Sequence, residues 1–190
     1  MATIGMQYPV WAEMSGESNG APTYNTGMVM GKAVGANLSW QREDNELYGD
    51  DVVAETDNSI TGYQLDITTT DLAEGVEAAV LGLQKVGSTD EYELTGDPTP
   101  YGGCGYIRVI TRNNTRLYKA LWYPKVQFGR NSESDNTKGK SISWGTPQLN
   151  GKGLAVYDDQ SGKAKFRKQQ VFSTIAAAKA YLNGKANISA

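Results

Sequence analysis

Two segments of this 190-residue chain alternate between two kinds of side chain, a period typical of β-strands with one buried face. One face of residues 28–41 holds Met28, Met30, Lys32, Val34, Ala36, Leu38 and Trp40, and the opposite face holds small or uncharged residues, among them Gly35, Asn37, Ser39 and Gln41. Residues 59–69 separate Tyr63, Leu65 and Ile67 from Gln64, Asp66 and Thr68 in the same way. The pattern predicts two long, adjacent strands whose shared outer face is polar.

The remaining elements are also rich in strand signals. They comprise a hairpin over residues 106–128 with its turn at Asn113 and Asn114, a hairpin over residues 148–157 with its turn at Asn150 and Gly151, and a strand near Ile142 and Trp144. Residues 1–14 contain Pro9, which cannot donate to a central ladder, so they predict an edge strand or an extended N-terminal arm.

Two helices complete the predicted elements: residues 71–84, capped by Asp71, and residues 174–183, capped by Ser173 or Thr174 and ended by Gly184. The length suits a single domain over residues 1–190. We therefore expect a mainly β fold, an antiparallel β-sandwich or partly closed barrel, with one medial and one short C-terminal helix.

Composition excludes several kinds of chemistry. The chain has no histidine and a single cysteine, Cys104, so its own residues can form neither a Ser-His-Asp triad nor a thiolate zinc site. We expect no catalytic residues, no metal and no cofactor. No apolar run approaches the roughly 18 residues of a membrane span, and residues 1–10 lack the pattern of a signal peptide. The expectation is a soluble protein made in the cytoplasm, without membrane contact.

Charge is strongly segregated along the chain. Residues 1–100 contain 17 acidic and 3 basic residues, whereas residues 101–190 contain 15 basic and 4 acidic ones. The basic residues are spread out, without the dense run that binds a phosphate backbone. Either the two halves fold against each other within one subunit, or an acidic surface of one copy meets a basic surface of the next and builds rings or filaments.

An acidic segment, residues 42–58, separates the two predicted strands and is longer than a turn requires. It combines seven acids with four large apolar residues: Glu43, Asp44, Glu46, Asp50, Asp51, Glu55 and Asp57 with Leu47, Tyr48, Val52 and Val53. This segment is either a solvated loop or one that becomes ordered against a partner. Its carboxylate spacing does not match a calcium-binding DxDxDG loop.

The polar faces of the two strands have two interpretations. They are an ordinary solvent face, or, because they lack long basic side chains, a surface past which DNA slides without sticking. Residues 101–105 (Tyr-Gly-Gly-Cys-Gly) lack the spacing of a phosphate-binding loop and lead into a strand. For them we expect a bulge or a close backbone approach, with Cys104 buried.

Five sequence blocks, taken in order, cover most of the chain: IGMQYPVWAEM, MGKAVGANLSWQREDNELYGDDVVAETDNS, YKALWYPKVQF, TKGKSISWGTPQLNGKG and FSTIAAAKAYLN. Together they resemble the major tail protein (tail tube protein) family of long-tailed, non-contractile bacteriophages, especially those of Gram-positive hosts. None of the blocks is a catalytic signature, and the resemblance rests on the series. The same tube fold recurs in contractile tails and in type VI secretion.

The resemblance implies a structural role. Such subunits assemble as hexameric rings whose inner sheets join into a β-barrel, and the rings stack into a tube through which the genome leaves the capsid. The expected partners are further copies of the chain and the tape-measure, tail terminator and distal tail proteins, with DNA passing through the lumen without specific binding. The expected location is the virion tail, after synthesis and assembly in the host cytoplasm.

The resemblance and the charge pattern together suggest roles for particular residues. An inter-ring loop over residues 42–58 would use Glu43, Asp44, Glu46, Leu47, Tyr48, Asp50 and Asp51. Lumen-facing candidates are Asn37, Ser39, Gln41, Glu55, Asp57, Gln64, Asp66 and Thr68. Basic interface candidates are Arg108, Arg112, Lys119 and Lys125. Intersubunit contacts are also expected from residues 1–14 and 171–182.

Two other classes of function remain open at this stage. One is a monomeric surface- or carbohydrate-binding β-sandwich that uses an exposed tryptophan as its platform: Trp11, Trp40, Trp122 or Trp144. The other is an enzyme with paired carboxylates, as in glycosidases, although nothing in the sequence pairs them.

Overall fold

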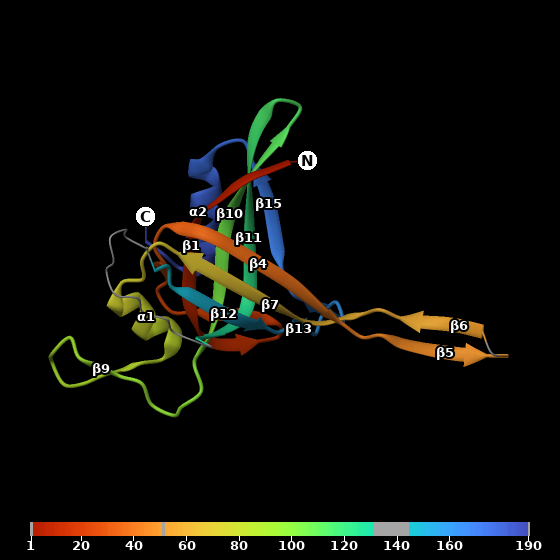
Figure 1. Ribbon diagram of the computed structural model, residues 1–190, viewed down its shortest axis with the longest axis horizontal. Coiled ribbons are helices and arrows are strands. Elements are labelled where there is room, and N and C mark those ends of the chain that lie inside the picture. The colour runs from red at the N-terminus through yellow and green to blue at the C-terminus, as the bar shows by residue number, and fades with distance from the viewer. Residues whose placement is uncertain (1, 51, 131–144, 190) are drawn as a thin grey trace, which may run out of the picture.

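Antiparallel strands dominate the computed structural model, which describes residues 2–50, 52–130 and 145–189 (Figure 1). The strands are β1 (Ala2–Ser18), β2 (Ala21–Tyr24), β3 (Met28–Val29), β4 (Ala33–Arg42), β5 (Asn45–Gly49), β6 (Val52–Asp57), β7 (Ile60–Thr69), β8 (Gln84–Lys85), β9 (Tyr92–Glu93), β10 (Tyr101–Arg112), β11 (Thr115–Gly129), β12 (Gln148–Gly153), β13 (Val156–Asp158), β14 (Lys163–Lys165) and β15 (Lys168–Phe172). The helices are α1 (Glu74–Leu81) and α2 (Ile175–Ala186).

One antiparallel sheet organises the molecule, with the strand order β2-β1-β10-β11-β12-β7-β4. The long strand β11 pairs with β10 along its length, with β15 through residues 118–122 and with β12 through residues 126–129. The sheet folds over so that β12, β7 and β4 enclose a core against β1, β10 and β11. The predicted fold class is confirmed as mainly β and sandwich-like, and the barrel is not closed.

The larger core lies between these two parts of the sheet. Tyr63, Leu65 and Ile67 of β7 are fully buried there, as their alternation predicts, and the ring centroids of Tyr63 and Tyr123 are 5.3 Å apart. Leu72 and two residues of α1, Val80 and Leu81, add to the same cluster. Other members come from several strands: Trp11, Met30, Cys104, Tyr106, Leu121, Val126, Phe128 and Leu149.

A second core forms on the outer face of β1, β10 and β11, where α2 packs. Its members are Val10, Ala12, Ile107, Ala120 and Trp122 from the strands and Ala178, Leu182 and Ala186 from α2. Gly105 permits this contact, because a Cβ there would lie 2.9 Å from the Leu182 Cδ2 atom. The pairing of β10 with β11 is irregular between Gly102 and Cys104, and Cys104 is fully buried, so the expected bulge, close approach and buried cysteine are confirmed. Burial raises the pKa of the Cys104 thiol.

Three strand predictions need correction. Residues 28–41 form two strands, because the chain bends at Gly31 (φ +117°), and irregular pairing between Ala33 and Gly35 leaves Val34 54% exposed. Residues 1–14 are not an arm: β1 lies in the sheet, and its irregular pairing between Gln7 and Val10 accommodates Pro9. Among the described strands, residues 2–7 pair with β10 alone and residues 14–18 with β2 alone, whereas Val10 and Trp11 pair with both β10 and β3.

The third correction concerns residues 148–157, which do not form a hairpin. Asn150 and Gly151 lie inside β12, which pairs with both β7 and β11. In contrast, the hairpin of β10 and β11 turns at Asn113 and Asn114 as predicted, and both have positive φ. The strand expected near Ile142 and Trp144 lies outside the described residues.

Both predicted helices exist, but their ends differ from the predicted ones. α1 begins after Ala73, which provides no side-chain cap, so the predicted cap at Asp71 is wrong. α2 is capped by Thr174, whose hydroxyl accepts a hydrogen bond from the Ala177 N–H at 3.3 Å. It continues through Gly184 and ends at Asn187, which adopts a left-handed conformation.

Candidate functional site

A projecting hairpin is the most conspicuous surface feature. The strands β5 and β6 pair with each other from Asn45–Asp57 to Gly49–Val52 and extend away from the main sheet (Figure 1). The base is fixed by a hydrogen bond from the Glu43 N–H to the Ser59 carbonyl at 2.9 Å. The described residues of the 42–58 segment therefore form a β-hairpin. The sequence alone was compatible with either a solvated loop or a segment that becomes ordered against a partner. Asp51 lies outside the described residues.

The side chains of the projecting hairpin lie in solvent. Leu47 and Tyr48 are each 62% exposed, Val52 is 66% exposed and Val53 is 41% exposed. The described acids, which are Glu43, Asp44, Glu46, Asp50, Glu55 and Asp57, are exposed too, and none of them forms an ion pair with another described residue. The Tyr48 hydroxyl donates to the Glu46 carboxylate at 2.5 Å, which raises the pKa of Tyr48. The hairpin thus presents apolar and acidic groups together, without a core of its own.

A polar face covers the outer side of β4, β7 and β12. The register places Asp66 between Asn37 and Asn150, and Gln64 between Ser39 and Lys152. Its members are Asn37, Ser39, Gln41, Gln64, Asp66, Thr68, Gln148, Asn150 and Lys152. The structure therefore brings six of the eight lumen-facing candidates onto one surface. The other two, Glu55 and Asp57, lie on the projecting hairpin.

Amide groups hold the carboxylate at the centre of this polar face. Asp66 accepts hydrogen bonds from the Asn150 Nδ2 atom at 3.1 Å and from the Gln64 Nε2 atom at 3.1 Å. Sequence reasoning missed the contribution of β12, because Asn150 and Gly151 read as a turn. It also missed Lys152, a long basic side chain, so the expectation that this face lacks such groups is wrong.

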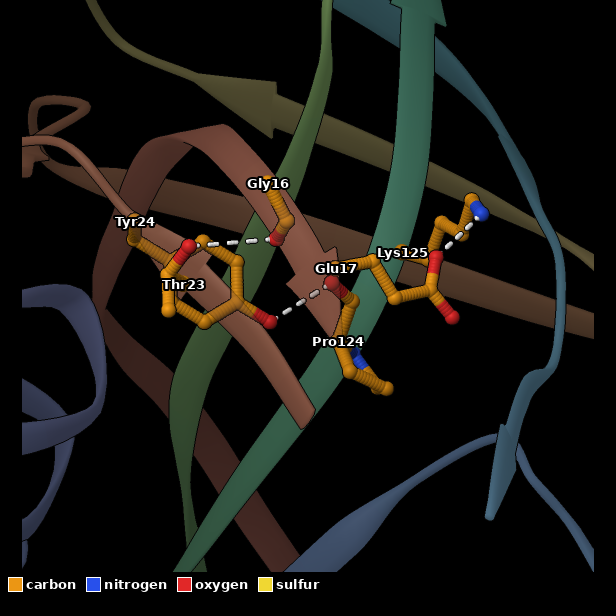
Figure 2. Close-up of polar contacts among 6 residues, drawn as sticks. All are labelled: Gly16, Glu17, Thr23, Tyr24, Pro124 and Lys125. Carbon is orange, nitrogen blue, oxygen red and sulfur yellow. Dashed lines mark hydrogen bonds and ion pairs between the residues drawn. The ribbon is translucent and has the colours of Figure 1, made fainter. Parts of the chain in front are cut away.

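The four basic candidates do not form one surface. Arg108 and Lys119 lie opposite each other on β10 and β11, and Arg112 is exposed near the end of that hairpin. Lys125 is elsewhere, and its Nζ atom forms an ion pair with Glu17 of the same chain at 2.7 Å (Figure 2). Lys125 is therefore neutralised within the subunit, contrary to its expected interface role.

Part of the segregated charge is paired internally. Besides the contact of Glu17 with Lys125, the Glu77 carboxylate lies 2.9 Å from the Arg130 guanidinium, and both pairs join the acidic half of the sequence to the basic half. Figure 2 also shows the Tyr24 hydroxyl donating to the Pro124 carbonyl at 2.7 Å beside the first pair. The acids of the projecting hairpin take no part in this pairing among the described residues.

The tryptophans do not provide an exposed platform in the part of the chain that is described. Trp11 and Trp122 are buried, and Trp40 is half-buried with the Arg167 guanidinium 5.4 Å from its ring centroid. Trp144 lies outside the described residues. Trp11, Trp40 and Trp122 therefore do not provide the exposed platform on which the binding-module alternative was based.

Two further findings concern the described residues as a whole. They contain no group of three or more histidine, cysteine or carboxylate side chains placed to hold a metal ion. Neither of the described helices, α1 and α2, has the length and apolar character needed to span a membrane.

No protein-family model matches the chain, and no curated protein matches it.

Proposed function

We propose that this protein is the structural subunit of a bacteriophage tail tube, polymerising as stacked, hexameric rings around a lumen that conducts DNA. The observation that carries this proposal is the projecting hairpin of β5 and β6. A two-stranded hairpin is at best marginally stable alone in water, and large apolar side chains exposed together mark interaction sites. This hairpin exposes Leu47, Tyr48, Val52 and Val53 far from any core, which suits a segment that contacts the next ring.

The open sheet supports ring formation. Among the described strands, β4 is the last in the sheet order, so one of its edges pairs with no described strand. Such an edge is a template for pairing with another chain, and closing the sheet through neighbouring subunits removes it. The ring then consists of strands joined by hydrogen bonds, which would resist opening under load.

The polar face next to this edge suits the wall of the lumen. It consists mostly of uncharged amides and hydroxyls, with Asp66 at its centre and Lys152 beside it. A carboxylate repels passing phosphates, and screening at about 0.1 M salt confines that repulsion to about 10 Å from the wall. In this role the protein is not an enzyme. Its partners are its own copies and the tape-measure, tail terminator and distal tail proteins, and its location is the virion tail.

Electron microscopy of the purified, concentrated protein tests the proposal. We expect rings or tubes with a central bore, whose number increases with protein concentration. Discrete particles of subunit size at every concentration would contradict the proposal and favour the monomeric binding module.

A further inference from the structure

Three basic side chains gather where β10, β11 and the start of β15 lie side by side. Arg108 and Lys119 are direct cross-strand partners, and Lys119 in turn faces Val171 of β15. Arg167 immediately precedes β15 and is close enough to Lys119 for their charges to interact. We call Arg108, Lys119 and Arg167 the cationic triad.

Aromatic groups hold two members of the cationic triad, Arg108 and Arg167, in place. The Arg108 Nη2 atom donates to the Tyr106 hydroxyl at 3.3 Å, and the rings of Tyr106 and Tyr123 stack with centroids 6.1 Å apart. The Arg167 guanidinium lies over the Trp40 ring. The buried Tyr123 hydroxyl has no hydrogen-bond partner in the part of the chain that the structure describes. Arg108 is thus positioned by a tyrosine hydroxyl and Arg167 by a tryptophan ring, and both groups leave the positive charge in place.

No described residue neutralises the charge of the cationic triad. None of its members forms an ion pair with another described residue. Burial lowers the pKa of Lys119, and the neighbouring Arg167 and Arg108 lower it further, as expected for like charges held together. A surface of this kind gains most from an anionic partner, which would relieve the repulsion.

We propose that the cationic triad binds the acidic projecting hairpin of a second copy of this chain. This inference rests on the proposed function and names the surface that receives the hairpin. The charges are complementary, since the hairpin carries six described acids without ion-pair partners and the triad carries three unpaired bases. The hairpin extends away from the body that contains β10, β11 and β15, so it is available to another subunit (Figure 1).

The surroundings of the cationic triad favour a protein hairpin over a phosphate backbone. Val171, opposite Lys119, is 47% exposed, and Met6, opposite Arg108, is half-buried. An exposed apolar side chain next to bases matches a segment in which Leu47 and Glu55 are direct cross-strand partners. A phosphate backbone would pair with the basic side chains but would give the neighbouring apolar side chain no partner.

Charge reversal tests the inference. In the double variant Arg108→Glu/Lys119→Glu, we expect the critical concentration for assembly, measured by pelleting and electron microscopy, to rise about tenfold or more. The matched control is Arg116→Glu/Lys163→Glu, which makes the same charge change at exposed positions outside the cationic triad. Circular dichroism checks folding, and Arg108→Gln/Lys119→Gln replaces the double variant if it does not fold.

A compensating change makes the test specific. Adding Glu46→Lys/Glu55→Lys to the Arg108→Glu/Lys119→Glu chain should restore assembly, because both sides of the contact are then reversed. Assembly of the double variant at the wild-type concentration, or equal loss in the control, would overturn the inference while leaving tube formation intact. Tight binding of short duplex DNA to the triad without an effect on assembly would overturn it too. If the wild-type chain forms no rings or tubes, the proposed function itself fails.

Discussion

The exposed apolar residues of the projecting hairpin allow a test of whether this element serves assembly or folding. In the variant Leu47→Ser/Tyr48→Ser/Val52→Thr/Val53→Thr the hairpin keeps its length and all its acids. Threonine retains the β-branch that favours strands, so the pairing of β5 with β6 should persist. Apart from the hydrogen bond of the Tyr48 hydroxyl to Glu46, the change removes only apolar surface.

The expected size of the effect follows from exposure. Burying a large apolar side chain completely is favourable by about 1.5–3 kcal/mol, and these four have between about four tenths and two thirds of their surface still exposed. Their burial against a partner is therefore favourable by at most about 3–7 kcal/mol per hairpin, before the costs of ordering side chains. We expect a net loss of about 2–4 kcal/mol, which weakens association by about 30- to 700-fold.

Two measurements separate assembly from folding. Sedimentation velocity across a concentration series gives the assembly threshold, which should rise in the variant. Urea unfolding below that threshold gives the free energy of unfolding, which should change by less than about 0.5 kcal/mol because these side chains contact no core. Leu94→Ser/Tyr157→Ser removes exposed apolar groups elsewhere and should leave the threshold unchanged. An unchanged threshold in the hairpin variant, or a fall of about 2 kcal/mol or more in its unfolding free energy, would refute the reasoning.

Three more substitutions, with Gly35→Ala as a control, test the fold and the lumen. Leu182→Ala should lower the free energy of unfolding by about 2–5 kcal/mol in urea, because it leaves a cavity under α2, and a loss below about 1 kcal/mol would contradict this. Gly153→Ala should cost about 1–3 kcal/mol because its Cβ would overlap the Tyr63 ring, whereas Gly35→Ala, with open space at its Cβ, should be nearly neutral by the same assay. Asp66→Lys should leave tubes intact but slow DNA release from particles built with the variant, and release at the normal rate would remove Asp66 from the lumen wall.

Local alternation was enough to predict the apolar face of β7, whereas on β4 only Leu38 and Trp40 of the predicted apolar face pack against the core. Tyr63, Leu65 and Ile67 are buried as expected, because the period of a strand fixes its faces wherever pairing is regular. The prediction failed at Asn150 and Gly151, where a pair that usually turns lies inside β12. Gly151 is needed there because a Cβ would meet the Leu65 carbonyl and the Phe128 ring, and both contacts come from distant strands.

The candidate site could also be predicted only in part, because some of its residues are brought together by strands distant in sequence. The polar residues of β4 and β7 could be recognised from their spacing, but Lys152 reaches the polar face only through the pairing of β12 with β7. Lys125 looked available in the sequence, yet its partner Glu17 is 108 positions away. The pairing of charges depends on tertiary structure, and no local pattern encodes it.

The pairing of β1 with β10 has a consequence for biosynthesis. Ala2 partners Thr111 and Glu13 partners Gly102, so β1, although β2 and β3 follow it closely in sequence, lacks its main neighbour until β10 has been translated. At about 5–20 residues per second it waits for roughly 5–20 s, and contacts so distant in sequence also slow folding itself. During that interval the nascent chain displays Val10 and Trp11, buried in the native state, and a chaperone acting early on this segment would therefore increase the yield of native subunits.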